Sequence, residues 1–256
     1  PYTTLFRSQP HRLVGHVAGE DHQVGPGELV AVFLLDRPQQ AAALVGIGVV
    51  GPAVERCETL VAGAAAATAI AIERYQPRAI INQGTSGGHN PDLNVFDIVL
   101  GLETTNFGMV KTPFAESGTG SNSLHWHEAF DMLPDDESDP EPIRKRYYPA
   151  DAALLAAARA VKQTYAQGKV VEGVIGSADC WNNELDRIAY LREMYGTEVE
   201  EMEAASVAQI AQQYGVPMMA IRVVSNNITN GGAYNPDTGK ACQDFVLQVV
   251  AQYLRA

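Results

Sequence analysis

The fold of this chain is decided by residues 79–88, Ala79-Ile80-Ile81-Asn82-Gln83-Gly84-Thr85-Ser86-Gly87-Gly88. The first part, residues 79–82, is a short apolar run of the kind found in strands buried on both faces. The second part, residues 83–88, is rich in glycine and predicts a turn. In α/β proteins, ligands bind at the carboxyl ends of strands. The segment therefore predicts a sheet protein with a ligand site beside residues 83–88.

Predicted strands and helices alternate on both sides of this segment. Short apolar runs predict strands at residues 29–35, 44–50, 96–100, 170–175 and 218–224. Alanine-rich or amphipathic stretches that end at Gly or Pro predict helices at residues 61–75, 150–165, 184–195, 203–214 and 239–254. This alternation favours a mixed or mostly parallel sheet with helices on both faces.

The length of 256 residues suits one large α/β domain, so we expect a single domain over residues 1–256. Residues 1–28 carry only weak strand patterns and begin without Met, so we expect an altered or truncated N-terminus there. Residues 103–149 are rich in Gly, Ser, Pro, Asp and Glu and predict a long irregular insertion.

The composition excludes several classes of function. A formal net charge of −12 opposes binding to nucleic acid or to an anionic membrane, and no apolar run reaches the ~18 residues of a membrane span. The three cysteines, Cys57, Cys180 and Cys242, lie far apart, which predicts neither a metal site nor a disulfide framework. This cysteine usage is compatible with a cytoplasmic protein, and export stays open because the N-terminus is unusual.

Small polar residues follow three of the predicted strands, at residues 84–88, 177–181 and 225–227. Glu201 and Glu203 stand just before a predicted helix. Because strand ends of one sheet converge in space, we expect these segments to line one pocket.

The same segments resemble the 5′-methylthioadenosine/S-adenosylhomocysteine nucleosidases of the purine nucleoside phosphorylase/nucleosidase superfamily. The stretch Glu201-Met202-Glu203-Ala204 is identical to the E-M-E-A motif of that family. Three further segments look like N-T-G-S-A-G-G…V-G-D-I-V, S-G-D-x-F and V-R-x-I-S-D of the family, namely residues 80–99, 177–181 and 221–226. The order and approximate spacing agree from about residue 57 to the C-terminus.

The resemblance implies a three-layer α/β/α sandwich around a mixed sheet, a homodimer, and no metal or organic cofactor. The implied activity is hydrolysis of the N-glycosidic bond of a purine (thio)nucleoside, such as 5′-methylthioadenosine or S-adenosylhomocysteine, which releases the free base. A small-molecule nucleoside is then the expected substrate.

Cleavage of a glycosidic bond passes through a positively charged sugar, so the site must hold the sugar hydroxyls and assist the departing base. Glu203 matches the family position that binds the ribose hydroxyls, and a carboxylate there favours the cationic sugar. Asn226 matches the position that contacts the base, so we predict Glu203 and Asn226 as catalytic residues. The predicted substrate-binding residues are Thr85, Ser86, Gly87, Cys180, Trp181, Glu201, Met202, Arg222 and Ser225. For Arg222, near the end of a buried strand, an ion-paired role is the alternative.

The chain departs from the family at Asn226, where the nucleosidases carry an Asp that protonates the purine. Asn cannot transfer a proton, but its amide can form a hydrogen bond with N7 or with a 6-oxo group. A 6-oxopurine nucleoside or futalosine hydrolase is therefore an alternative, and Asp179 is an alternative acid.

A second departure is the lack, in residues 1–30, of a Glu in the context that orients the attacking water in the family. This keeps two further alternatives open, a nucleoside phosphorylase and a catalytically retired binding or storage protein. The segment 84–88 contains no Lys or Arg for phosphate, which favours water, whereas Arg56 and Arg222 leave phosphate open. Residues 125–127, His-Trp-His, either cap the 5′ side of the sugar, from the same or a neighbouring subunit, or pack locally.

Overall fold

The computed structural model describes residues 60–129 and 147–255, together with the backbone of five strands between residues 5 and 48. Three of these N-terminal strands form a small antiparallel sheet, with β2 between β1 and β3. Their bounds are Leu5–Gln9 for β1, Arg12–Val17 for β2 and Glu20–Asp21 for β3. The expectation of an altered N-terminus falls largely outside the described residues.

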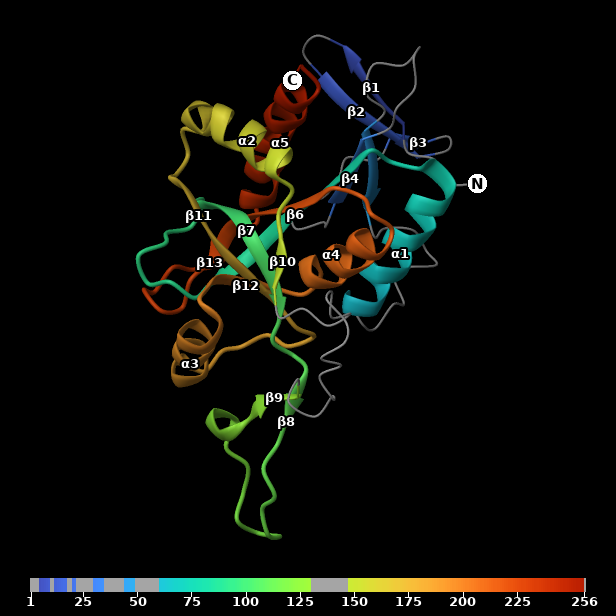
Figure 1. Cartoon of the computed structure of the whole chain (residues 1–256). Coiled ribbons are helices and arrows are strands. Elements are labelled where there is room, and N and C mark those ends of the chain that lie inside the picture. Colours follow the sequence, from blue (N-terminus) through green and yellow to red (C-terminus); the bar gives the residue numbers. More distant parts are fainter. Residues whose placement is uncertain are drawn as a thin grey trace.

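The main sheet has eight strands and is mixed (Figure 1). Its order is β10-β7-β11-β12-β6-β4-β5, and β13 pairs in parallel with β6 and antiparallel with β7. The strands β7, β11, β12, β6 and β13 therefore close into a ring. The bounds are Val30–Leu34 (β4), Leu44–Gly48 (β5), Ala79–Gly88 (β6), Ile98–Asn106 (β7), Tyr148–Pro149 (β10), Val170–Ser177 (β11), Thr197–Glu201 (β12) and Met218–Asn226 (β13).

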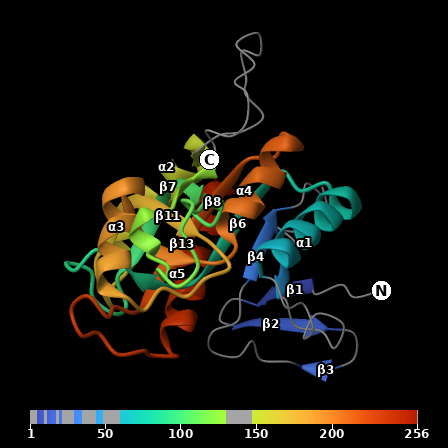
Figure 2. The same cartoon turned by 90° about the horizontal axis from the view of Figure 1, so that it is seen from below.

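Helices cover both faces of this sheet, as Figures 1 and 2 show. On one side α2 (Ala152–Val161) and α5 (Thr238–Tyr253) bury Leu154 and Phe245 against the strands. On the other side α1 (Leu60–Tyr75) and α4 (Ala204–Gln213) contribute Ala71 and Val207 to a second apolar cluster. The predicted layers, helices around a mixed sheet, are thereby confirmed.

Local sequence explains where the helices begin and end. The Asp151 side chain accepts hydrogen bonds of 3.0 Å from the amides of Ala153 and Leu154, which caps α2. A short 3₁₀ turn, Lys162–Thr164, follows that helix. The third helix of the central region, α3 (Leu185–Tyr195), ends at Gly196, whose φ of 66° is the left-handed conformation that glycine adopts without strain. Within the described residues no helix is long and apolar enough to cross a membrane.

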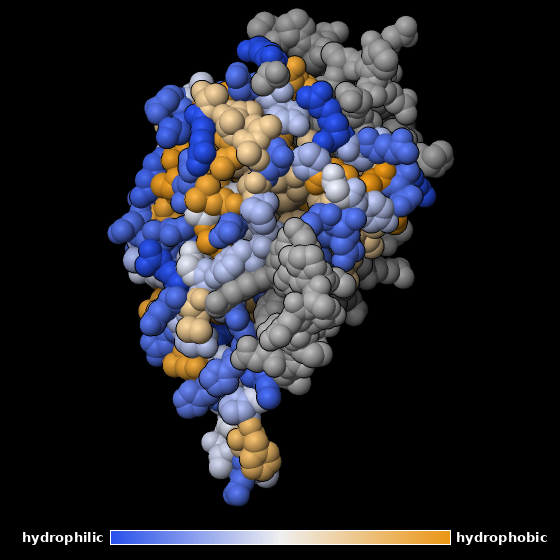
Figure 3. Space-filling view, in the orientation of Figure 1, coloured by the Kyte–Doolittle hydropathy of each residue, from blue (hydrophilic) through white to orange (hydrophobic). Residues whose placement is uncertain are grey.

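An arm formed by residues 108–129 extends from the body of the protein (Figure 1). Its base is a short antiparallel pair, β8 (Val110–Lys111) and β9 (His127–Glu128), and it includes a 3₁₀ turn at Ser123–His125. Figure 3 shows a hydrophobic area near the end of the arm, and Phe114 within the arm is 92% exposed. The predicted insertion at 103–149 thus begins later than expected, because residues 103–106 belong to β7.

Two predictions about local structure are wrong. Residues 83–88 do not form a turn but complete the ten-residue strand β6. Residues 197–201, to which no strand was assigned, form β12 between β11 and β6. Both corrections lie in the same part of the sheet, beside the predicted pocket.

Candidate active site

Three residues lie side by side across the sheet where the predicted pocket was expected. Gly87 of β6 is paired with Glu200 of β12 on one side and with Asn226 of β13 on the other. Directly paired residues point to the same face of a sheet, so the two polar side chains flank a position that has none. A Cβ atom on Gly87 would lie 3.6 Å from Glu200 Cγ and 3.8 Å from Asn226 Nδ2. We call the space over Gly87, between Glu200 and Asn226, the glycine gap.

The alternation of β6 explains which of its residues face this gap. Thr85 and Gly87 are partly exposed, whereas Ser86 and Gly88 between and after them are buried on the opposite face. The Ser86 hydroxyl donates to the carbonyl of Val223 at 3.0 Å. At Gly88 a Cβ atom would lie 2.4 Å from the side chain of Asn227, so only glycine fits there. Of the predicted β6 residues, Thr85 and Gly87 therefore face the site and Ser86 supports the sheet.

Asn226 presents an amide N–H to the gap. The Ser225 hydroxyl lies 3.1 Å from Asn226 Oδ1 and 3.1 Å from the Ser86 carbonyl oxygen, and it donates to these acceptors. With Oδ1 occupied by Ser225, the Nδ2 group is the part of the Asn226 amide near Gly87. An amide in this orientation donates to an acceptor such as a ring nitrogen.

Glu201 and Arg222 form a fully buried ion pair on the opposite face of β12. Arg222 donates to the carbonyl oxygens of Asn82 and Ile221 at 3.0 and 3.1 Å, and to the Glu201 carboxylate. Glu201 also accepts from the Ser177 hydroxyl and from the amides of Glu203 and Ala204. These contacts indicate a supporting role for both side chains, and the contact of Glu201 and Arg222 with a substrate stays a prediction. The ion pair holds the start of α4 in place. This is the ion-paired role that was the alternative for Arg222.

Glu203 is the least engaged of the buried acids. Its Oε2 atom accepts from the Met202 amide at 3.3 Å and lies 3.9 Å from Arg222. Burial, followed by the charge of Glu201, raises the pKa of Glu203 to about 8. A carboxyl group with this pKa is largely protonated at neutral pH, so it can both donate and accept hydrogen bonds. The neighbouring Met202 is partly exposed, which leaves it free to contact a ligand.

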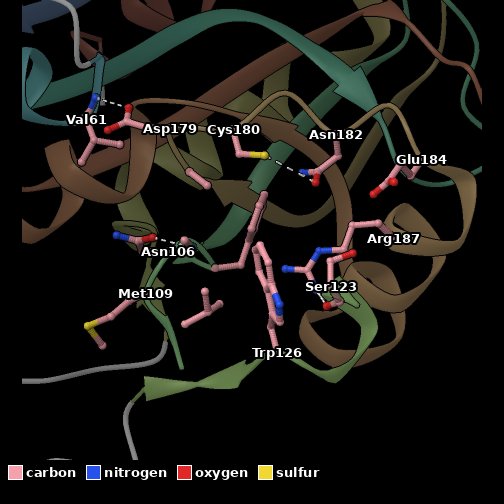
Figure 4. Close-up of a pocket in the computed structure, with 14 residues that line it drawn as sticks. Val61, Asn106, Met109, Ser123, Trp126, Asp179, Cys180, Asn182, Glu184 and Arg187 are labelled. Carbon is pink, nitrogen blue, oxygen red and sulfur yellow. Dashed lines mark hydrogen bonds between the residues drawn. The ribbon is translucent and has the colours of Figure 1, made fainter. Parts of the chain in front are cut away.

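Cys180 and Trp181 lie in different environments, and the Cys180 thiol contacts Asn182 Oδ1 at 3.7 Å. Trp181 is 67% exposed. Cys180 lines a cavity of about 500 Å³ that also includes Asn106, Trp126 and Arg187 (Figure 4). Trp126 of the arm contacts α3, with the Arg187 guanidinium 5.7 Å from its ring centre, and it is flanked in the arm by two exposed histidines. Neither Glu203 nor Asn226 lines this cavity.

Three polar residues near the gap were not selected from the sequence: His89, Asn182 and Glu200. All three are joined, because Asn182 donates its backbone and side-chain N–H groups to Glu200 and His89 Nε2 lies 3.1 Å from Glu200 Oε2. The sequence signal that could have identified Glu200 was its position next to Glu201. The structure adds that both acids are buried. Across residues 60–129 and 147–255, no group of three His, Cys, Asp or Glu side chains is arranged to hold a metal ion.

Comparison with known proteins places these residues in a family. The family model described as the phosphorylase superfamily matches residues 43–255. A 5′-methylthioadenosine/S-adenosylhomocysteine nucleosidase of Bacillus cereus is 32% identical over 164 residues, which cover 64% of this chain and 62% of that protein. A Bacillus anthracis protein of the same name matches with the same values. The match thus spans less than two thirds of the length of these curated relatives, and the predicted resemblance is confirmed.

Solved structures agree on the fold. A nucleosidase of the same name from Colwellia psychrerythraea, in complex with adenine, has a TM-score of 0.59 at 24% identity and covers 75% of this chain and 74% of its own. The futalosine hydrolase of Helicobacter pylori has a TM-score of 0.59 at 19% identity and covers 75% of each chain. These TM-scores, at sequence identities below 25%, show that the three proteins share a fold.

Proposed function

The chain belongs to the phosphorylase superfamily, and we propose that it hydrolyses the N-glycosidic bond of an adenine (thio)nucleoside and releases adenine. Substrates of the 5′-methylthioadenosine and S-adenosylhomocysteine class are suggested by the names of the Bacillus relatives. The observation that carries the proposal is Glu203, a buried and sparingly engaged carboxyl group. Glu203 lies just after the end of β12, the strand whose residue Glu200 borders the glycine gap.

The geometry supports a division of labour between sugar and base. Glu203 binds the ribose hydroxyls. The positive charge that develops on the sugar favours the ionised form of Glu203, and this negative form in turn stabilises the sugar cation. Asn226 donates its amide N–H to N7 of the purine and stabilises the electron pair that the base takes with it. Thr85 and Met202, both partly exposed, border the sugar. Water attacks the anomeric carbon from the face opposite the base as the bond to N9 breaks. The water loses one proton, and the departing base takes up one proton from solvent to become adenine.

A 6-oxopurine nucleoside hydrolase is a second candidate, because Asn226 replaces the acid of the nucleosidases and an amide also hydrogen-bonds to a 6-oxo group. Phosphorolysis is a third, although segment 84–88 offers no cationic side chain to phosphate. A fourth candidate is a catalytically inactive binding protein of the same fold, which would bind nucleosides without cleaving them.

Base release separates these candidates. The purified chain is incubated with 5′-methylthioadenosine, S-adenosylhomocysteine, inosine and futalosine, with and without phosphate, and the free base is measured by chromatography. We expect adenine to be released from the first two nucleosides without phosphate. Release only from inosine or futalosine would support the 6-oxopurine candidate, and release only with phosphate would support phosphorolysis. No release from any of them would contradict enzymatic cleavage.

We also propose that the chain forms a homodimer. The support is the arm of residues 108–129, in which Phe114 and Met109 expose apolar side chains, since an exposed apolar surface on a projecting segment favours contact with another protein. Light scattering of the purified chain tests this, and a monomer mass at micromolar concentration would contradict it.

A further inference from the structure

We propose that Glu200 selects the base of the nucleoside by accepting a hydrogen bond from the exocyclic amino group of a 6-aminopurine. This inference rests on the proposed function and assigns base selection to a residue outside the E-M-E-A motif. It starts from the position of Glu200 opposite Asn226, with only the glycine gap between them.

The position of Glu200 follows from the register of four strands. Gly176 of β11, Glu200 of β12, Gly87 of β6 and Asn226 of β13 lie in one row across the sheet. Neighbouring strands are about 4.8 Å apart, so the backbones of Glu200 and Asn226 are about 10 Å apart. Because Gly87 has no side chain, β6 itself places no atoms between the two polar groups.

The carboxylate of Glu200 is held in place by two neighbours. Its Oε2 atom receives the Asn182 side-chain amide and lies 3.1 Å from His89 Nε2, and its Oε1 atom accepts from the Asn182 backbone amide at 3.0 Å. The other ring nitrogen of His89, Nδ1, lies 2.7 Å from Thr197 Oγ1, which fixes the imidazole. A buried carboxylate clamped in this way keeps its orientation when a ligand binds.

The Glu200 carboxylate keeps unused acceptor capacity on Oε1. A carboxylate offers about four acceptor positions, two on each oxygen. The two hydrogen bonds from Asn182 occupy one position on each oxygen, whereas His89 Nε2 lies 3.1 Å from Oε2 without forming a hydrogen bond. Oε1 therefore has a free position, and it is the oxygen that lies 3.9 Å from the place of a Gly87 Cβ atom. The spare hydrogen-bonding capacity of Glu200 is thus on the side of the glycine gap.

The chemistry of the two edges of the gap favours a 6-amino group. Asn226 offers a donor, which suits N7 of adenine and of hypoxanthine equally. Glu200 offers only an acceptor, which suits the amino group of adenine and repels the 6-oxo oxygen of hypoxanthine. A site with a buried polar group that the wrong substrate leaves unpaired discriminates strongly. Glu200 therefore compensates for the ambiguity that Asn226 introduces.

The test compares three nucleosides that differ only at C6: 5′-methylthioadenosine, its analogue with hydrogen at C6, and 5′-methylthioinosine. The value of kcat/KM is measured for the native chain and for Glu200→Gln. For the native chain we expect the amino compound to exceed the other two. In Glu200→Gln we expect kcat/KM for the amino compound to fall about 10- to 100-fold, while the C6–H compound changes by less than about threefold.

The pattern across substrates separates recognition from a merely structural role. A structural defect lowers kcat/KM for all three nucleosides equally, and this result would overturn the proposal. Glu193→Gln, an identical change at an exposed position of α3, serves as the matched control and should change nothing. If Glu200→Gln does not fold, the native chain still decides, because equal kcat/KM for the amino and C6–H compounds would contradict the contact. Absence of cleavage of all three by the native chain would instead contradict the proposed function.

Discussion

The two faces of β12 carry adjacent buried glutamates that differ in how fully protein groups use their carboxylate oxygens. Glu201, on one face, is paired with the buried Arg222 and accepts hydrogen bonds from α4 and β11. Glu200, on the other face, contacts Asn182 and His89 and retains an acceptor position toward the glycine gap. The difference shows that burial of an acid does not by itself indicate a ligand site. Unused hydrogen-bonding capacity distinguishes the recognising face from the supporting one.

The largest effect is expected on the supporting face. Arg222→Leu leaves the Glu201 carboxylate buried without its cation, and we expect the free energy of unfolding to fall by about 3–5 kcal/mol. Chemical denaturation measures this change. The double variant Glu201→Leu/Arg222→Met, which removes both charges, should recover much of the loss.

The matched control for this experiment is the exposed pair of Arg159 and Glu172, which lie 2.6 Å apart. Solvent screens such a pair, so Arg159→Leu should unfold at nearly the native denaturant concentration. If Arg222→Leu were no less stable than Arg159→Leu, the supporting role of the buried pair would be wrong.

An intermediate effect is expected at Glu203, which lies beyond the end of β12. Glu203→Gln removes the carboxyl group whose ionised form stabilises the sugar cation, and we expect kcat to fall about 10²- to 10³-fold. Steady-state kinetics with 5′-methylthioadenosine measures this. An unchanged kcat would exclude the proposed role in binding the ribose.

The same variant should alter the pH dependence of stability. In the unfolded chain Glu203 ionises near its usual pKa of 4.5, whereas in the folded protein it remains protonated up to about 8. The unfolded state therefore binds fewer protons between these pH values, and native stability falls as pH rises through that window. At about 1.4 kcal/mol per pKa unit, the contribution is on the order of a few kcal/mol. Glu203→Gln should flatten this fall in thermal denaturation curves, and an identical pH profile for both proteins would count against the raised pKa.

The smallest effect on stability is expected at Gly87. A Cβ atom there makes only ordinary contacts, so Gly87→Ala should change the free energy of unfolding by less than about 1 kcal/mol. The methyl group would nevertheless occupy the glycine gap, and we expect kcat/KM to fall about tenfold or more. In the neighbouring Gly88→Ala the added Cβ atom overlaps Asn227, so this variant should lose about 1–3 kcal/mol of stability. If Gly87→Ala and Gly88→Ala lost stability and kcat/KM to the same extent, the proposal that the gap holds a ligand would be wrong.

The sequence predicted most of the fold because apolar runs mark the central strands and alanine-rich stretches mark the helices. It did not predict β12, since Thr197, Glu198, Glu200 and Glu201 leave Val199 as the only apolar residue of that strand. Their burial depends on partners distant in sequence, such as Arg222 and His89. Residues 83–88 were predicted as a turn because they contain three glycines, but two of these, Gly87 and Gly88, leave room for side chains from other strands.

The candidate site was predicted in part. The pairing of Gly87 with Asn226 and of Ser177 with Glu201 agrees with the expectation that these segments are neighbours, whereas the catalytic and binding roles stay predictions. The separate roles of Glu200, Glu201 and Arg222 could not be predicted, because the direction of each side chain depends on the register of β12 between its neighbours. Three acids within four residues look equivalent in a sequence, and only cross-strand pairing assigns each to its face.

The closed ring of strands has a consequence for the evolution of this protein. Because β6, β12 and β13 are held on both sides by backbone pairing, the row that contains Glu200, Gly87 and Asn226 keeps its spacing whatever side chains it carries. Substitution of one or two side chains in this row can therefore change the nucleobase specificity of a descendant protein, while the backbone of the sheet keeps its structure.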